Sequence, residues 1–149
     1  MTAQRDLFDE YGAYHRDPRN LVCHEIGIPL IVLAIIALLR IVALPFGLNL
    51  ALIVLVAVVV YYAAAFWRRY TAATAIAIAG LLVFYMVAMV VWWPVAIVLF
   101  VAGWVFQFVG HAYEGKSPAF LTNLLHLLVG PLWVASHLVP RSRSSSSAR

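Results

Sequence analysis

Histidine, amide and carboxylate side chains gather in two segments far apart in the chain, residues 11–29 and residues 104–119. The candidate metal ligands in or near these segments are His15, His24, His111 and His126. Imidazole nitrogens with a carboxylate nearby suit Fe or Zn better than Mg or Ca, and open coordination positions suit Fe(II) and oxygen. The residue types therefore predict a transition-metal site, with iron and zinc both open. A structural interpretation stays open as well: His15 could be a solvated interfacial residue, and His24 could simply cap or anchor the first span.

The second segment has helical spacing. At 100° per residue, four side chains fall within an arc of about 80° on one helix face. They are Trp104, Gln107, His111 and Glu114. Polar groups at membrane depth cost free energy unless they are paired or bind a ligand, so they are candidates for function. Glu114 could bind the metal, hold an imidazole in place or pair with Lys116, and we favour the second role.

The composition excludes a soluble domain. Of the 149 residues, 65% are hydrophobic and only 11% are charged, whereas soluble domains are about half apolar and a quarter charged. The single cysteine, Cys23, excludes a disulfide scaffold. The net charge of +4 could indicate nucleic acid binding, but the basic residues form no stripe with interleaved aromatics. We therefore expect an integral membrane protein that binds no nucleic acid.

Hydropathy predicts an all-α helical bundle with four transmembrane spans. The spans are expected at about residues 26–44, 48–67, 71–92 and 95–111. The first run is long enough to cross, because about 19 residues rise roughly 28 Å as a helix. A fifth apolar stretch, residues 119–139, is interrupted by polar residues and by Gly130-Pro131. We predict that this stretch is a re-entrant or interfacial element that does not cross.

Charge predicts the orientation of this single membrane domain, residues 1–140. With four spans, nine of the ten Lys and Arg residues lie on one side, and Arg40 is the exception. The positive-inside rule makes that side cytoplasmic. We therefore expect a multi-pass protein of a bacterial inner membrane with both termini in the cytoplasm. Residues 1–25 would be cytoplasmic or interfacial, and residues 141–149 a disordered tail.

The same topology brings the two polar segments together. The first span begins at the cytoplasmic face just after His24, and the fourth span returns to that face and ends at His111. We therefore expect both imidazoles at the same membrane depth. The sequence lacks the G-x-S-x-G and H-E-x-x-H motifs and the histidine boxes of membrane desaturases. It also lacks the paired discontinuous spans of a transporter.

Taken together, the two segments resemble the membrane family of the fungal 2-hydroxy fatty acid dioxygenase, which acts in phytosphingosine breakdown and has numerous bacterial relatives. The first segment reads Tyr11-x3-His15-x4-Asn20-x3-His24-x2-Gly27-Ile28-Pro29. The second reads Trp104-x2-Gln107-x2-Gly110-His111-x2-Glu114-x3-Pro118-Ala119. The resemblance implies a non-haem Fe(II) enzyme that uses O2 to shorten a 2-hydroxy fatty acid by one carbon (α-oxidation) with release of CO2.

The resemblance also implies roles for particular residues. The essential histidines would be His15, His24 and His111, whereas His126 lies outside the matched pattern and is a possible fourth ligand. The motif residues expected to take part in catalysis are Tyr11, Asn20, Gln107 and Glu114. The cations expected to neutralise the substrate carboxylate are Arg16, Arg19 and Lys116. The expected partners are the 2-hydroxy acid, O2 and membrane lipid. Whether the protein forms a homo-oligomer is left open.

One interpretation competes with the enzyme. The same histidines could bind Zn or Fe without turnover, in a non-catalytic membrane scaffold or a metal-binding protein. The identity of the bound metal, and oxygen-dependent consumption of a lipid acid, separate the two.

Overall fold

The computed structural model of the protein describes residues 8, 10–12, 16–115 and 125–139. Its helices in chain order are α2 (Pro18–Leu39), α3 (Leu50–Ala65), α4 (Thr71–Ala88), α5 (Trp93–Glu114) and α6 (His126–His137), with a 3-10 turn, η1 (Pro45–Gly47), before α3. Extended pairing in the described ranges is limited to a single bridge between Ala43 and Asn49. The predicted all-α class is confirmed.

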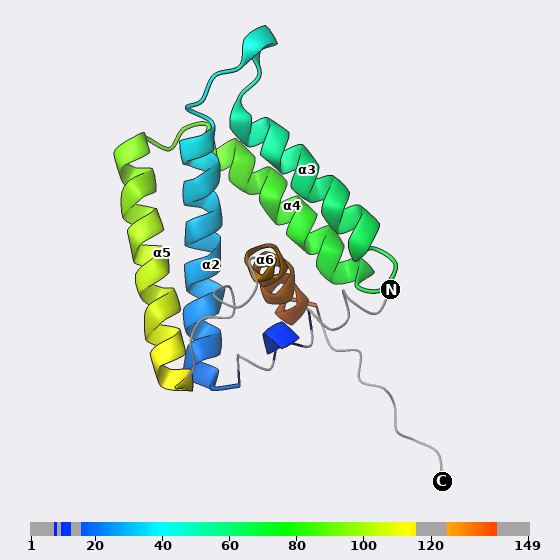
Figure 1. The fold of residues 1–149 in the computed structure, drawn as a ribbon, viewed down its shortest axis with the longest axis vertical. Helices are drawn as coiled ribbons and strands as arrows, with labels where there is room; N and C mark the ends of the chain where they lie inside the picture. The colour runs from blue at the N-terminus through cyan, green and yellow to red at the C-terminus, as the bar shows by residue number, and fades with distance from the viewer. Residues whose placement is uncertain (1–7, 9, 13–15, 116–124, 140–149) are drawn as a thin grey trace.

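The helices form two pairs, and α6 lies across them. In Figure 1, α2 and α5 lie side by side and run in opposite directions, and α3 and α4 form a second pair beside them. The view looks nearly along the axis of α6, so α6 lies across the other helices. It packs against both α2 and α4. Because α2 begins and α5 ends at the same end of the pair, the two polar segments meet there.

Three helices are long and apolar enough to cross a membrane: α2, α4 and α5. The fourth apolar helix, α3, has 16 residues, which rise roughly 24 Å against a hydrocarbon core of about 30 Å. The four-span topology therefore stays a prediction. Helix α6 has 12 residues, a rise of roughly 18 Å, and residues 119–124 of the predicted non-crossing stretch lie outside the described ranges.

The first helix begins earlier than the apolar run at residue 26 that predicted it. Asp17 is the N-cap, and its side chain accepts a hydrogen bond from the backbone N–H of Arg19 at 2.8 Å. Pro18 follows at the first helical position, where its missing N–H costs nothing. Hydropathy does not detect a polar cap or a proline. Because these two residues start α2 early, Asn20 and His24 belong to the helix. At the same end of the pair, Gly115 terminates α5 in the left-handed conformation with φ +68°.

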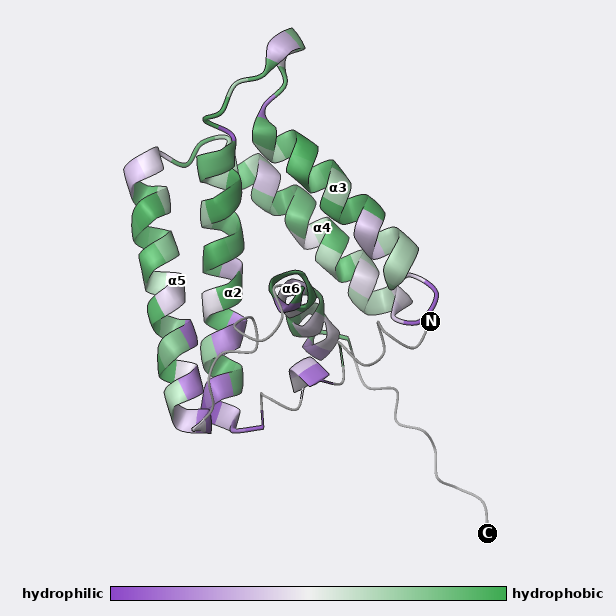
Figure 2. Ribbon diagram, viewed as in Figure 1, coloured by the Kyte–Doolittle hydropathy of each residue, from purple (hydrophilic) through white to green (hydrophobic). Residues whose placement is uncertain are grey.

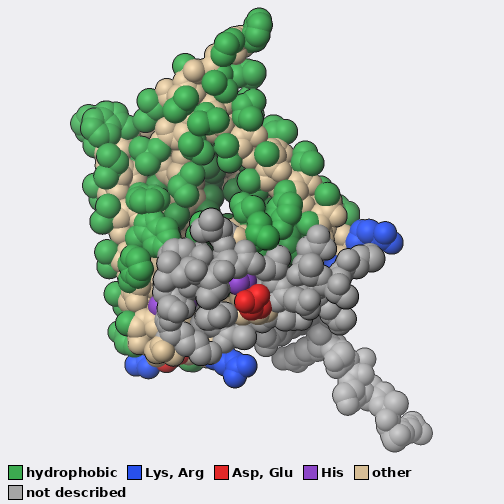
Figure 3. Space-filling model, in the orientation of Figure 1, with side chains coloured by type: hydrophobic (Ala, Val, Ile, Leu, Met, Phe, Trp, Pro, Cys, Tyr) green, Lys and Arg blue, Asp and Glu red, His purple; other side chains and the backbone are tan. Residues whose placement is uncertain are grey.

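Polarity is uneven over the surface. Figure 2 shows hydrophilic residues concentrated where α2 begins and α5 ends, and hydrophobic residues over the rest of these helices. On the face shown in Figure 3, hydrophobic side chains cover the upper part, and Lys and Arg side chains lie at the lower left edge and at the right side. Large apolar side chains such as Val90, Met86 and Val98 are 84%, 69% and 66% exposed, which suits a lipid-facing surface.

Candidate functional site

The α2–α5 pair packs unusually closely through three glycines. A Cβ atom on Gly27 would lie 2.8 Å from the carbonyl oxygen of Gly103, and one on Gly103 would lie 2.9 Å from the carbonyl oxygen of Gly27. A Cβ atom on Gly110 would lie 2.5 Å from Asn20 Oδ1 and 3.3 Å from His24 Nδ1. Small residues at such contacts let two helix backbones approach each other. This approach brings the polar residues of the two helices into one site.

His24 on α2 and His111 on α5 meet at the polar end of the pair. Their ring centroids are 4.8 Å apart with the planes at 87°, and the residues are only 1% and 5% exposed. The Nδ1 atom of His24 lies 2.9 Å from the backbone carbonyl of Asn20. If Nδ1–H donates to this carbonyl, the lone pair of the neutral ring is on Nε2, the tautomer that metal-ligating histidines use.

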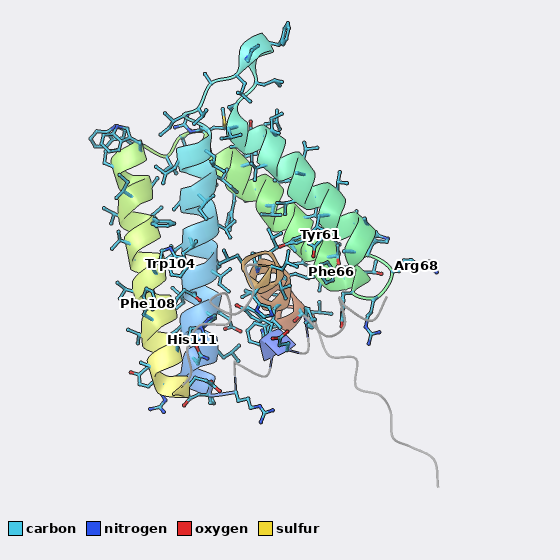
Figure 4. The ribbon with its side chains drawn as sticks, viewed as in Figure 1. Tyr61, Phe66, Arg68, Trp104, Phe108 and His111 are labelled. Atoms are coloured by element: carbon cyan, nitrogen blue, oxygen red, sulfur yellow. The ribbon has the colours of Figure 1, made fainter. Side chains whose placement is uncertain are left out.

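A cleft of about 190 Å³ opens beside these two rings, between α2, α5 and α6. Its polar lining residues are Tyr11, His24, Gln107, His111 and His126. Its apolar lining residues are Ile28, Ile31, Val32, Ile35, Phe100, Trp104, Leu127 and Gly130. The sequence analysis missed the apolar walls, although the spacing of residues 28, 31 and 35 places them on one helix face. Figure 4 shows Trp104, Phe108 and His111 following one another along α5 towards its polar end.

Tyr11 and α6 close the polar end of the cleft. The Tyr11 ring lies 5.8 Å from the His126 ring and 5.3 Å from the Trp133 ring, measured between centroids. Tyr11 is 5% exposed, and burial raises the pKa of its phenol, so it stays a neutral hydrogen-bonding group. His126 is 1% exposed, and its Nε2 lies 3.6 Å from Glu10 Oε2.

Gln107 contributes an amide to the cleft. The residue is 7% exposed, and its Nε2 has no hydrogen-bond partner among the described residues. A buried N–H group without a partner costs about 1–3 kcal/mol. A ligand oxygen in the cleft would remove this cost, so the Gln107 amide marks a position suited to a polar ligand atom.

Glu114 links the end of α5 to the start of α2. Its carboxylate accepts hydrogen bonds from the backbone N–H groups of Arg16 and Asp17, the latter at 2.8 Å, and from Asn20 Nδ2 at 3.1 Å. A negative charge at a helix N-terminus is also favoured by the helix dipole. Glu114 thus fixes Asn20, whose backbone carbonyl lies against His24. Its predicted role in orienting an imidazole stays a prediction.

Of the predicted substrate-binding cations, the two that the structure describes, Arg16 and Arg19, do not line the cleft. Arg19 pairs with Asp17 at 2.9 Å, its side chain is 65% exposed, and its guanidinium lies over the Tyr113 ring. The hydrogen bond from the Arg19 side chain lowers the pKa of Asp17, so this pair stays charged. Arg16 is exposed and does not line the cleft. Lys116 lies outside the described residues.

The donor set suits a transition metal only in part. His24 and His111 supply two adjacent imidazoles, and neutral imidazole is a common ligand of Fe and Zn. Among the described residues, no three His, Cys, Asp or Glu side chains are close enough to hold a metal ion. His126 also lines the cleft, and its place as a fourth ligand stays a prediction. His15, the third predicted ligand, lies outside the described residues.

Comparison with known proteins identifies the family. Residues 1–142 match the profile of a family described as 2-hydroxy-palmitic acid dioxygenase Mpo1-like. The chain belongs to the Mpo1-like family. The 2-hydroxy-palmitic acid dioxygenase MPO1 of Saccharomyces cerevisiae is 28% identical over 125 residues, which cover 80% of this chain and 69% of the yeast protein. No solved structure matches the chain. The resemblance drawn from the two polar segments is confirmed, and both segments lie inside the region matched by the Mpo1-like profile.

Proposed function

We propose that this protein is a membrane-bound, Fe(II)-dependent dioxygenase that shortens 2-hydroxy fatty acids by one carbon. Membership of the Mpo1-like family and the name of the yeast relative support the reaction class. The observation that carries the proposal is the contact between His24 and His111 at the buried end of an apolar cleft. A long-chain acid needs both features, a polar end for its reacting atoms and apolar walls for its tail.

The reaction balances with one molecule of O2. The bond between C1 and C2 of the acid breaks, C1 leaves as CO2, and C2 passes from the alcohol to the carboxyl oxidation level. These two changes release four electrons, and O2 accepts four. The products are the acid shorter by one carbon, CO2 and water, so no further reductant is required.

His24 and His111 would hold the iron, with His15 as the expected third ligand. The chemistry that bound Fe(II) would supply is the activation of O2 and the orientation of the substrate. The Gln107 amide would donate a hydrogen bond to a substrate oxygen, because its Nε2 has no partner among the described residues. The apolar walls and Tyr11 would exclude water from the reacting atoms. Glu114 would act as a positioning residue through Asn20.

The membrane is part of the proposal. The three long apolar helices suit a multi-pass protein, and the polar end of the α2–α5 pair would lie at the cytoplasmic interface. A long-chain 2-hydroxy acid would have its carboxylate at this interface and its tail in the bilayer. We propose both termini in the cytoplasm of a bacterial inner membrane; labelling from outside the intact cell at Ser145, changed to Cys, would contradict this arrangement.

The deciding experiment measures metal and turnover together. Protein purified without oxygen should contain about one iron per chain, and should consume O2 with 2-hydroxypalmitate but not with palmitate, because palmitate lacks the hydroxyl group. Pentadecanoate and CO2 should appear in equal amounts. Bound zinc, or bound iron with no substrate-dependent O2 uptake, would instead favour the non-catalytic metal-binding scaffold.

A further inference from the structure

Burial falls steadily along the cleft on the α2 side. His24 at its polar end is 1% exposed, Ile28 one turn further is 8% exposed, and Ile35 at its far end is 39% exposed. On the α5 side, His111 and Gln107 are buried, whereas Phe100 is partly exposed. The cleft is therefore closed at its polar end and open at its apolar end.

The open end lies at membrane depth. Ile35 belongs to α2 and Phe100 to α5, both of which are long and apolar enough to cross a membrane. Ile35 lies roughly 16 Å along α2 from His24, about half of a hydrocarbon core of about 30 Å. A side chain exposed at that depth faces lipid, because there is no water in the bilayer core. Because Ile35 is exposed at this depth, the apolar end of the cleft opens sideways into the hydrocarbon layer. We call this opening, at Ile35 and Phe100, the mouth.

The cleft holds a limited length of alkyl chain. Between His24 and Ile35, α2 rises roughly 16 Å at 1.5 Å per residue. With C–C bonds of about 1.5 Å, an extended alkyl chain advances roughly 1.25 Å per carbon, so about 13 carbons would span this distance. Any carbon beyond this number would extend past Ile35 into lipid, which is as apolar as the cleft walls.

We propose that the cleft takes its substrate sideways from the bilayer through the mouth at Ile35 and Phe100, and binds only the carboxyl-proximal part of the chain. This inference rests on the proposed function, which identifies the polar end of the substrate as a 2-hydroxy carboxylate. The buried Gln107 amide favours binding of the oxygen-bearing end at the closed end of the cleft, since no described residue accepts a hydrogen bond from its Nε2. The cleft consequently sets no upper limit on chain length.

A second cavity offers a competing path for the tail. It measures about 130 Å³, lies between α2, α4 and α6, and shares Ile28 and Val32 with the cleft. Gly80 lines this second cavity, and a Cβ atom there would have no neighbour within 4 Å. A tail that turned into this cavity would lie against α4 and α6 instead of passing Ile35. The substitution Gly80→Leu would partly fill this path and leave the mouth unchanged.

The test uses the intact protein in lipid nanodiscs, with substrate expressed as its mole fraction in the lipid. Adding inert lipid at constant total substrate should lower the rate, because the enzyme draws on the bilayer concentration. For 2-hydroxy acids longer than the cleft, KM should be independent of chain length. A sharp fall in kcat/KM beyond one length, or a rate that is unaffected by lipid dilution, would overturn the proposal.

Variants locate the mouth. Ile35→Trp should raise KM for 2-hydroxypalmitate about tenfold and leave KM for 2-hydroxyoctanoate within about twofold, because the shorter chain ends before residue 35. Val101→Trp is the matched control, since Val101 is on α5, 56% exposed and outside the cleft lining. An equal effect of Ile35→Trp on both acids, or a larger effect of Gly80→Leu on the long acid, contradicts entry at Ile35.

A binding measurement keeps the cleft testable without turnover. After iron is removed with a chelator, 2-hydroxypalmitate should still raise the unfolding temperature, as any ligand of the folded state does. Ile35→Trp should reduce this rise for the long acid and spare the short one. If the native protein turns over no 2-hydroxy acid but shows these changes in unfolding temperature, the proposed function is wrong and the lateral mouth is supported. If 2-hydroxypalmitate does not raise the unfolding temperature, the lateral mouth is wrong.

Discussion

The α2–α5 pair and the α3–α4 pair are built from similar apolar residues, yet they bury different side chains. On α2 and α5 the buried polar residues are Asn20, His24, Gln107 and His111. Among the described residues of α3 and α4, the buried polar groups are Thr74 and the hydroxyl of Tyr62. Apolar composition therefore places a helix in the membrane, but it does not make a site. The site comes from a few polar residues at the end of one pair.

Glycines differ between the two pairs in the same way. The glycines of the first pair lie against the neighbouring helix, so that a Cβ atom on Gly27 would come within 2.6 Å of Gln107 Nε2. Gly80, on α4, has open space where its Cβ would be. Close approach is thus found in the pair that carries the two imidazoles and not at Gly80. The α3–α4 pair instead supports α6, through a hydrogen bond from the Tyr62 hydroxyl to the carbonyl of Leu128.

The largest expected difference between the pairs is in activity. His111→Ala should abolish oxygen-dependent turnover while the protein remains folded in the membrane, because α5 keeps its apolar length without the imidazole. Thr74→Val is the matched control: it removes a buried hydroxyl that has no partner among the described residues, so activity and stability should change little. Rates of O2 uptake and circular dichroism check both variants. Turnover by His111→Ala at the native rate would show that the site is elsewhere.

The same substitution at two glycines tests the packing. Gly27→Val should lower the free energy of unfolding by about 3 kcal/mol, since the added atoms meet the backbone oxygen of Gly103, which cannot move without shifting α5. Gly80→Val should be close to neutral, because its Cβ enters open space. Unfolding midpoints in detergent measure both effects. Equal midpoints would mean that the close contact between α2 and α5 contributes little to stability.

Much of this arrangement could be predicted from the sequence. Apolar runs of sufficient length predicted the helical class, and their alternating direction predicted that His24 and His111 would lie at one end. This inference needed only the depth of each residue, which hydropathy supplies. The spacing of Gln107 and His111 on one helix face was likewise visible, and both line the cleft.

Other features depend on which faces of the helices meet, and sequence alone does not specify this. The early start of α2 depends on a polar cap at Asp17 rather than on hydropathy. Arg19 was expected near the substrate but pairs with that same cap residue. His126, a possible fourth ligand, enters the cleft from α6, which lies across the bundle in an orientation that charge and periodicity do not determine.

Glu114 tests how the first pair holds its polar end together. In Glu114→Gln, the side-chain carbonyl oxygen can still accept in the place of Oε2, but the side-chain N–H group then stands in the place of Oε1, against the backbone N–H of Arg16 that donates there. The expected loss is about 2 kcal/mol of stability, with turnover reduced 10–100-fold, as is typical when a residue that positions a metal ligand is changed. Asp17→Asn is the control, because Asn caps helices equally well and only an exposed ion pair is lost. Complete loss of iron from Glu114→Gln would instead indicate direct ligation.

The smallest expected effect is in the second pair, at the hydrogen bond from α3 to α6. Tyr62→Phe keeps the buried ring and removes the hydroxyl that donates to the Leu128 carbonyl, so unfolding should become easier by about 1 kcal/mol. Tyr61, visible on α3 in Figure 4, provides the control, since its hydroxyl has no hydrogen-bond partner among the described residues and Tyr61→Phe should be silent. Turnover should fall slightly in Tyr62→Phe alone, because α6 carries His126 and Leu127 into the cleft. An unchanged KM together with lower stability would show that α3 supports the fold of α6 without affecting the cleft.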